Sequence, residues 1–228
     1  MNIVVIGGGQ PGRFGNDFCN RARAEGHDVY VISHKDYGTN DPKQIVADFA
    51  NVEEFLEKFK NLINHLDKID ILLYNSSSHT QTYPMNPYLL TSNGEVSITA
   101  WEQSLRLHAI IPHVLSIEAL KKMSETSAIV FMTTGMSRHV TRTEWTDMVG
   151  YAGFKGIQNH LMIGLAHHND KGAIVTCVAP HFPYDDADKY KIILNTAYEY
   201  ITQLTKENNG KIRLIWNSDS DQYLTEDF

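Results

Sequence analysis

The chain has 228 residues, of which 42% are hydrophobic and 21% are charged, as expected for one globular domain with a full core. Its formal net charge of -7 at pH 7 disfavours a general nucleic-acid or acidic-membrane surface, and it contains no run of about 18 apolar residues that could span a membrane. The N-terminus lacks the basic stretch and long apolar run of a signal peptide, and Cys19 and Cys177 form no C-x-x-C motif, so we expect a reducing, cytoplasmic environment.

The beginning of the chain predicts a strand, a glycine-rich loop and a helix in direct succession. Residues 2–6 form the apolar strand, residues 7–15 contain the glycines, and residues 16–25 form the helix. Glycines let the backbone approach a pyrophosphate, and a helix N-terminus favours its negative charge. The spacing is not G-x-G-x-x-G. The two glycines that best fit a dinucleotide-binding loop are Gly9 and Gly15, with Arg13 between them. A simple turn is the alternative.

The second predicted strand, residues 28–33, ends in Ser33-His34-Lys35. A dinucleotide fold that prefers NAD usually carries an acidic residue here, which binds the ribose 2′-hydroxyl. The polar and basic end of this strand suits a 2′-phosphate instead. Asp36 lies one residue further on, and a solvated turn is the alternative.

The middle of the chain continues the alternation of strands and helices. We expect a short strand at residues 44–48, a helix at 52–66 and an apolar strand at 69–74. This strand ends in Asn75-Ser76-Ser77-Ser78. Small polar residues at the carboxyl end of a strand suit a ligand crevice in an open α/β sheet.

A long helix is predicted from Trp101 to Met123, with Pro112 inside it. Proline removes one backbone hydrogen bond and should kink the helix, with the freed carbonyl near His108. A fifth strand over residues 128–133 then ends in Thr134-Gly135-Met136-Ser137, which places hydroxyl groups at its carboxyl end.

A second long helix is predicted from Asp147 to His168, and Tyr151 and Lys155 lie four residues apart on one of its faces. A nearby cation favours the phenolate and lowers the pKa of a tyrosine. Such a tyrosine can pass a proton to or from a reacting hydroxyl or carbonyl near neutral pH. An ordinary exposed Tyr–Lys pair is the alternative. The predicted core stripe of this helix consists of Phe154, Ile157, Leu161 and Leu165.

The last part of the chain predicts a strand at residues 174–178, a helix at 187–206 and a strand at 211–216. The acidic, polar tail over 217–228 could be disordered or could cover a partner subunit. Alternating strands and helices predict a single α/β domain over residues 1–216, a Rossmann-type doubly wound parallel sheet of about seven strands with helices on both faces. Right-handed crossovers should bring four positions to one edge of this sheet: Gly9, Asn75, Thr134 and Phe182.

The sequence Tyr151-Ala-Gly-Phe-Lys155 matches the Y-x-x-x-K of the short-chain dehydrogenase/reductases, which the chain resembles over residues 1 to about 216. That family usually shows T-G-x-x-x-G-x-G after its first strand. Here the stretch reads Gly8-Gly9-Gln10-Pro11-Gly12-Arg13-Phe14-Gly15, with arginine in the middle glycine position. This variant resembles the NADP-dependent, pteridine-reductase-like branch.

Three further stretches follow the order of the family's motifs. Asp48 lies where the family's adenine-contacting Asp follows the third strand. Tyr74-Asn75-Ser76-Ser77 replaces N-N-A-G and matches its second Asn, whereas Val178-Ala179-Pro180-His181 replaces V-x-P-G and departs from it at the glycine.

The resemblance implies an NADP(H)-dependent oxidoreductase, with NAD(H) as the alternative cofactor, that interconverts a carbonyl and an alcohol. Tyr151 would be the acid/base, and Lys155 would lower its pKa and bind the nicotinamide ribose. The family's catalytic serine falls on Thr134, with Ser137 as a second candidate. The family's helix Asn falls on His108, which could relay protons or block their path.

The resemblance also implies a set of cofactor-binding residues: Gly9, Gly12, Arg13, Phe14, Gly15, Ser33, His34, Lys35, Asp48, Phe49, Asn75, Ser76, Ser77, Tyr151, Lys155, Pro180 and Phe182. The expected partners are a small carbonyl or alcohol substrate and further copies of the chain in a homodimer or homotetramer. No nucleic acid, membrane or metal is expected, because the chain contains no H-E-x-x-H and places no carboxylate beside His160, His167 or His168.

A dinucleotide-binding protein of this kind with little or no catalysis, such as a redox sensor or partner-binding module, is the second hypothesis. The departures at Thr134, His108, Tyr74 and His181 favour it. The intact pair of Tyr151 and Lys155 argues against it.

Overall fold

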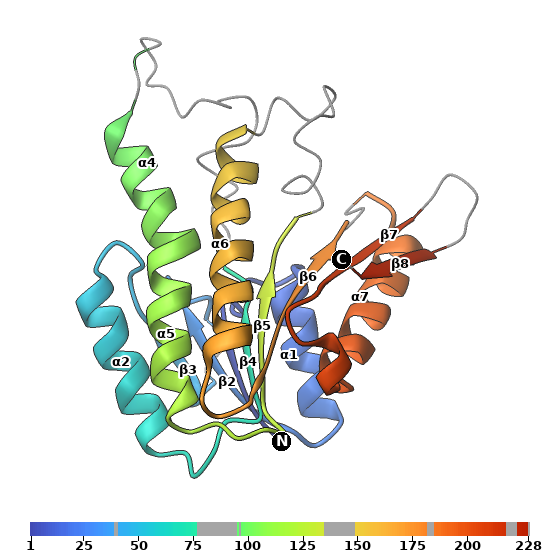
Figure 1. The fold of residues 1–228 in the computed structure, drawn as a ribbon, viewed down its shortest axis with the longest axis horizontal. Coiled ribbons are helices and arrows are strands. Elements are labelled where there is room, and N and C mark those ends of the chain that lie inside the picture. The colour runs from blue at the N-terminus through green and yellow to red at the C-terminus, as the bar shows by residue number, and fades with distance from the viewer. Residues whose placement is uncertain are drawn as a thin grey trace.

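The computed structural model describes residues 1–38, 41–76, 95, 97–134, 149–181, 185–217 and 223–227. These residues form one sheet with the strand order β3-β2-β1-β4-β5-β6-β7-β8 (Figure 1). Strands β1 to β7 are parallel, and β8 is antiparallel to β7. The strands are β1 Asn2–Ile6, β2 Asp28–Ser33, β3 Gln44–Val46, β4 Ile71–Tyr74, β5 Ala128–Met132, β6 Ile174–Pro180, β7 Ile212–Asn217 and β8 Tyr223–Asp227.

Helices cover both faces of this sheet. Helices α2, α5 and α6 lie on one face, and α1 and α7 lie on the other (Figure 1). The helical elements are α1 Phe14–Ala24, α2 Val52–Asn64, α4 Ile98–Leu105, the π-helical turn η1 Arg106–Ile110, α5 Ile111–Leu120, α6 Val149–His168, α7 Ala187–Thr202 and the 3-10 turn η4 Lys206–Asn208. The predicted doubly wound α/β fold is confirmed. None of the helices in the described ranges combines the length and apolarity that a membrane span requires.

The strands build a separate core on each face of the sheet. Val4 and Ile6 of β1 pack beneath α2, α5 and α6, whereas Ile3 and Val5 pack beneath α1 and α7. Successive side chains of a strand point to opposite faces, so a sheet covered on both sides requires continuous apolar strands. The apolar runs of the sequence meet this requirement.

The predicted long helix is interrupted by the π-helical turn η1, just before Pro112. In this turn the N–H of Ile111 donates to the carbonyl of Arg106, five residues earlier. The carbonyl of Leu107 would need the N–H of Pro112 in the same pattern, and proline has none. The hydroxyl of Tyr74 donates to this carbonyl at 2.6 Å instead. The irregularity predicted at Pro112 is therefore a π-helical turn, and the freed carbonyl belongs to the neighbour of His108.

The end of the chain departs from the prediction. Residues Tyr223–Asp227 form β8, which pairs with β7 from Asn217↔Tyr223 to Arg213↔Asp227. Of the two alternatives expected for the tail, disorder is wrong for these residues. Backbone hydrogen bonds along an otherwise open strand edge do not require apolar side chains, so composition alone gave no signal for this strand.

Candidate active site

The carboxyl ends of neighbouring parallel strands bring the predicted loops to one edge of the sheet. Ile6 of β1 is in register with Ile32 of β2 and with Tyr74 of β4, and Tyr74 is in register with Phe131 of β5. The glycine loop and the segments that follow β2, β4 and β5 therefore begin at the same level. A crevice outside the carboxyl ends of the strands is the usual ligand site of an open α/β sheet.

The glycine loop packs tightly against the end of β4. The side-chain amide of Asn75 donates to the carbonyl of Gly7 at 2.9 Å. A Cβ atom on Gly15 would meet the Asn75 amide and would lie 2.6 Å from the Gly7 carbonyl oxygen. A Cβ atom on Gly9 would lie 2.9 Å from the Cβ of Ser33, at the end of β2. These glycines are thus required by close packing of the loop.

The same loop leaves two features available to a ligand. Helix α1 begins at Phe14 with Arg13 as its exposed N-cap residue, so the start of the helix lies at the crevice. Ser76 is 5% exposed, and its buried hydroxyl has no hydrogen-bond partner among the described residues. A buried hydroxyl without a partner is unfavourable, which makes Ser76 a ready partner for a polar group in the crevice.

The end of β2 places aromatic and basic groups beside the glycine loop. His34 lies 5.8 Å from Tyr37 edge-to-face and 6.2 Å from Phe49, measured between ring centroids. Partial burial and the nearby Lys35 ammonium lower the pKa of His34, against the opposing effect of Asp48. The imidazole is therefore a neutral flat ring at pH 7.

Ser33 builds this turn rather than facing the crevice. Its hydroxyl donates to the carbonyl of Lys35 at 2.9 Å and accepts from Gln44 at 3.2 Å. Asp36 is likewise turned towards its own loop, because its carboxylate accepts the N–H of Gly38 at 2.8 Å. The hydroxyl of Ser33 is thus engaged within the turn, and one oxygen of the exposed Asp36 carboxylate is engaged in its own loop.

Helix α6 holds Tyr151 and Lys155 on its buried face, as predicted. The rest of that face differs from the predicted core stripe, because Ile157 is 41% exposed and Leu161 is only partly buried. Its buried residues are Tyr151, Phe154, Lys155, Gln158, Asn159, Met162, Leu165 and Ala166. Phe154 and Leu165 of the predicted stripe are buried as expected, whereas Ile157 and Leu161 lie to one side of the buried face that Tyr151 and Lys155 share.

The ammonium of Lys155 lies inside the protein, with 1% of the residue exposed. It donates to the carbonyl of Met132 at 2.7 Å and to Oε1 of Gln158 at 3.0 Å, and it lies 5.9 Å from the ring centroid of Tyr151. Burial lowers the pKa of Lys155 from 10.5 to about 7, and Cys177 opposes this effect. Lys155 is thus a lysine that can exchange its proton near neutral pH.

The π-helical turn η1 brings His108 to the same place. The buried ring of His108 meets Tyr151 edge-to-face at 5.7 Å and stacks on Phe154 at 6.4 Å, both between centroids. Three of the four predicted catalytic residues therefore form one buried cluster. Single π-helical turns occur frequently at functional sites.

The fourth predicted residue, Thr134, follows the end of β5 and is partly exposed. Its neighbour Thr133 donates its hydroxyl to Oδ1 of Asn159 at 2.7 Å, and the thiol of Cys177 donates to the same oxygen at 3.6 Å. These contacts tie β5 and β6 to α6 directly below Thr134.

Comparisons with known proteins agree on the fold. No family model and no curated protein matches the sequence. A short-chain dehydrogenase/reductase from Serratia marcescens superposes with a TM-score of 0.76 at 16% identity, over 94% of this chain and 96% of that one. The chain has the short-chain dehydrogenase/reductase fold.

Two other solved structures of this fold contain a nicotinamide cofactor. A Brucella ovis short-chain oxidoreductase in complex with a partially ordered NAD matches with a TM-score of 0.73 and 17% identity, over 93% of this chain and 98% of that one. BdcA in complex with NADPH matches with a TM-score of 0.70 and 14% identity, over 94% and 92%.

Some predicted residues of this short-chain dehydrogenase/reductase fold have no described environment. Ser77, Ser137 and Phe182 lie outside the described residues. Pro180 ends β6 and is partly buried, and the N–H of His181 after it donates to the carbonyl of Ile215 at 2.9 Å.

Sequence reasoning missed Gln158, Thr133 and Asn159. Gln158 and Asn159 could have been found, because they fall three and four residues after Lys155 and therefore share its helix face. The sequence could not distinguish Thr133 from Thr134, because adjacent threonines offer the same kind of hydroxyl group.

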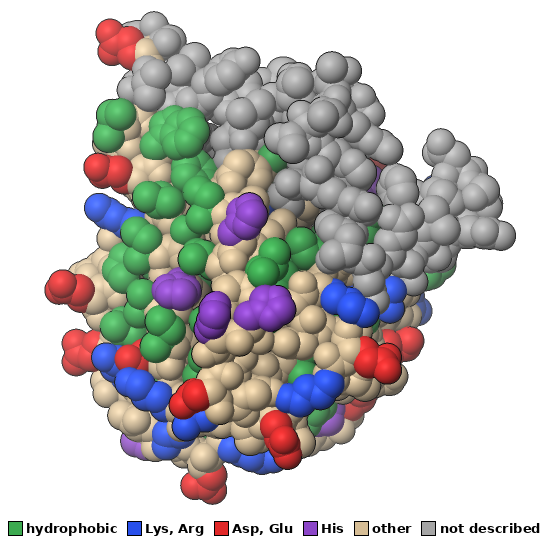
Figure 2. Space-filling view, in the orientation of Figure 1, with side chains coloured by type: hydrophobic (Ala, Val, Ile, Leu, Met, Phe, Trp, Pro, Cys, Tyr) green, Lys and Arg blue, Asp and Glu red, His purple; other side chains and the backbone are tan. Residues whose placement is uncertain are grey.

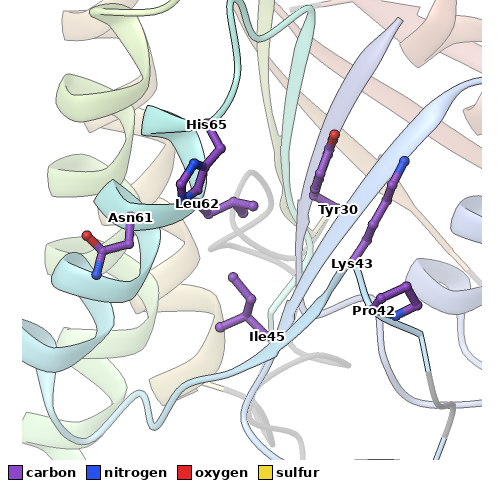
Figure 3. Close-up of a pocket in the computed structure, with 7 residues that line it drawn as sticks. All are labelled: Tyr30, Pro42, Lys43, Ile45, Asn61, Leu62 and His65. Atoms are coloured by element: carbon purple, nitrogen blue, oxygen red, sulfur yellow. The ribbon is translucent and has the colours of Figure 1, made fainter.

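A depression of about 320 Å³ lies elsewhere, between α2 and the strands β2 and β3 (Figure 3). Its lining consists of Tyr30, Pro42, Lys43, Ile45, Asn61, Leu62 and His65. It contains none of the predicted site residues, and Lys43 is already paired with Asp28. Within the described part of the chain, no three His, Cys, Asp or Glu side chains are placed to hold a metal ion.

Proposed function

We propose that the protein is an oxidoreductase that uses a nicotinamide dinucleotide to interconvert a carbonyl and an alcohol. The observation that carries the proposal is the cluster of Tyr151, Lys155 and His108 where α6 meets η1, at the end of the sheet that bears the glycine loop. When bound, the nicotinamide supplies or accepts the hydride. The chain itself would supply the proton and orient the carbonyl.

The crevice has the features that a dinucleotide requires. The backbone from Gly9 to Gly15 and the start of α1 would receive the pyrophosphate. The unpartnered hydroxyl of Ser76 would meet a ribose or phosphate oxygen. His34 and Phe49 would contact the adenine, beside Asp48. The cofactors present in two solved structures of the same fold support this assignment.

We favour NADP(H) over NAD(H). The ribose 2′-phosphate would lie near the end of β2, where Lys35 is exposed and Arg13 is exposed across the glycine loop. Charge-assisted contacts to phosphate are strong. The acidic residue of this turn, Asp36, is engaged by Gly38 and is thereby held in its own loop.

Tyr151 would transfer the proton to the carbonyl oxygen, or remove it from the alcohol in the reverse direction. The buried ammonium of Lys155, 5.9 Å from its ring, would stabilise the phenolate that forms. Thr134, or Ser137 in its place, would donate a hydrogen bond to the carbonyl oxygen. His108 would hold the ring of Tyr151 through its edge-to-face contact and relay protons at that point.

A dinucleotide-binding protein without catalysis is the second candidate. It is favoured by the direction of the Lys155 ammonium, which is bonded to Met132 and Gln158 inside the protein. The deciding experiment combines calorimetry with NADPH and a screen of aldehydes and ketones. Binding with turnover that depends on Tyr151 supports the oxidoreductase; binding without turnover across a broad panel supports the second candidate.

We also propose that the chain forms a homodimer or homotetramer through the face of α4, η1, α5 and α6, in a cytoplasmic setting that suits two buried cysteines outside any disulfide. Hydrophobic side chains gather over α4 and α5, with histidines beside them (Figure 2). The exposed apolar residues of this face are Trp101, Leu105, Ile110, Ile117, Ile157 and Ile163. On α6, Gly153, Gly156 and Gly164 have open space where a Cβ would lie, so a second helix could approach closely.

A further inference from the structure

Gln158 is a buried amide whose described hydrogen bond goes to Lys155. Its Oε1 atom accepts from the lysine ammonium at 3.0 Å, and the residue is 1% exposed. Its Nε2 atom is buried and has no partner among the described residues. A buried amide that is only half satisfied is unfavourable compared with an apolar side chain of similar size. Packing alone therefore does not explain a glutamine at this position.

The surroundings of Lys155 explain it. The main-chain carbonyl of Met132 is the other acceptor of the ammonium. The titratable groups around it are Cys177 on β6, Tyr151 on α6 and His108, which touches the Tyr151 ring from η1. Burial raises the pKa of the Cys177 thiol, against the opposing effect of Lys155, and no hydrogen bond joins this thiol to the ammonium among the described residues. Among the described side chains, Gln158 is thus the acceptor for the buried cation.

The two acceptors orient the ammonium of Lys155 in addition to stabilising its positive charge. Met132 belongs to β5, which is held in register with β6, and Gln158 lies on the same rigid helix as Lys155, three residues away. An ammonium carries three hydrogens in a fixed geometry. When two of them have fixed acceptors, the direction of the third is determined.

We infer that Gln158 is a positioning residue for Lys155, which holds the ammonium in place and helps it keep its proton inside the protein. The inference rests on the proposed function, in which Lys155 assists proton transfer by Tyr151. It is a property of this chain's own residues, and it can be measured without any substrate.

The test compares two substitutions of opposite effect. Gln158→Met keeps the length of the side chain and removes the acceptor, so it should lower the pKa of Lys155. Gln158→Glu adds a carboxylate at the same place and should raise it. A hydrogen bond to a charged group corresponds to a shift of roughly one to two pH units. Gln203→Glu makes the same chemical change on an exposed side chain beyond α7 and should cause no shift.

The measurement is an NMR titration of the full chain with ¹³Cε-labelled lysine, in which Lys155 is assigned by its loss in Lys155→Met. The expected result is a downward shift in Gln158→Met and an upward shift in Gln158→Glu. Unchanged titration of Lys155 in both folded variants overturns the inference, even if their melting temperatures fall, because that result describes a packing role. If Gln158→Met does not fold, the presence or absence of the upward shift in Gln158→Glu decides.

The pH profile of kcat/KM separates this inference from the proposed function. If the unmodified protein reduces carbonyls, the part of its kcat/KM profile that depends on Lys155 should shift along the pH axis in each Gln158 variant. The shift should have the same direction as the change in the pKa of Lys155 measured by NMR. Shifted titrations in a protein that reduces nothing would uphold the role of Gln158 and reject the oxidoreductase. If turnover is normal and depends on Tyr151, but neither Gln158 variant changes the pKa of Lys155, the oxidoreductase is upheld and the role of Gln158 is rejected.

Discussion

The hydroxyl of Tyr74 lies 2.6 Å from the carbonyl oxygen of Leu107 and donates a buried hydrogen bond to it. This contact joins the end of β4 to the π-helical turn before Pro112, where the main chain offers no N–H to that carbonyl. This π-helical turn places the ring of His108 against the ring of Tyr151. A strand residue thereby supports the geometry of the candidate catalytic cluster from below.

Removing that hydroxyl should destabilise the protein. Tyr74→Phe leaves the Leu107 carbonyl buried and unsatisfied, which costs about 1–3 kcal/mol of unfolding free energy. Urea denaturation measures the difference. The control is Tyr198→Phe, which removes a hydroxyl bonded to the exposed carboxylate of Glu25 at 2.8 Å. Water can replace that bond, so a loss in Tyr74→Phe no greater than in Tyr198→Phe would contradict the argument.

Turnover should depend on the hydroxyl of Tyr151. Tyr151→Phe keeps the ring against His108 and removes the proton donor, so kcat should fall by roughly 10²–10⁴-fold while NADPH affinity changes little. Lys155→Ala should reduce both. Steady-state kinetics and calorimetry on folded variants give the comparison. A Tyr151→Phe protein with near-normal turnover would end the catalytic assignment.

Burial of Lys155 should make stability rise with pH above neutrality. The folded protein releases this proton at a pKa of about 7, whereas 10.5 is the ordinary value that applies to the unfolded chain. Between these values the unfolded chain binds one more proton, so raising the pH favours the folded state, by roughly 1.4 kcal/mol per pH unit.

Chemical denaturation between pH 7 and pH 8 checks this sign, because the unfolded cysteines, whose ordinary pKa is 9.0, release most of their protons above that range. Lys155→Met has no such proton to lose, so its unfolding free energy should rise less over the same range. If the unfolding free energies of the two proteins change in parallel with pH, the pKa of Lys155 is not lowered in the folded protein.

Arg13 should distinguish the two cofactors. Arg13→Ala should weaken NADPH binding more than NADH binding, because the lost contact is to the 2′-phosphate. Calorimetry with both cofactors on both proteins measures this. Equal affinities for NADPH and NADH in the unmodified protein would remove the basis of the preference.

Assembly should depend on the face of α5 and α6. Ile117→Glu places a charge on this face, whereas Ile192→Glu makes the same change on α7, and the two isoleucines are similarly exposed, at 45% and 42%. Light scattering at micromolar concentration should give an oligomer for the unmodified chain and for Ile192→Glu, and a smaller species for Ile117→Glu. A monomeric unmodified chain would count against the proposal.

The sequence was informative wherever periodicity and loop chemistry act locally. Apolar runs of strand length predicted the seven parallel strands, and the spacing of Tyr151 and Lys155 placed both on one buried helix face. The sequence did not predict features that depend on a contact between residues far apart in the chain. Ile157 fits a helical stripe as well as Gln158 does, and the partner surface that buries one and not the other lies on β6 and η1. The strand β8 depends on the free edge of β7, which no residue of the tail reveals.

The contact between Gly15 and Asn75 has a consequence for how this sequence can change. A methyl group at position 15 would displace the Asn75 amide and so release the carbonyl of Gly7, which that amide binds. A smaller residue at position 75 would not make room for the methyl group, which would still lie 2.6 Å from the Gly7 carbonyl oxygen, and it would leave that carbonyl without its donor. Neither change relieves the other, so the glycine at position 15 and the asparagine sixty positions later are expected to be retained together among descendants of this chain.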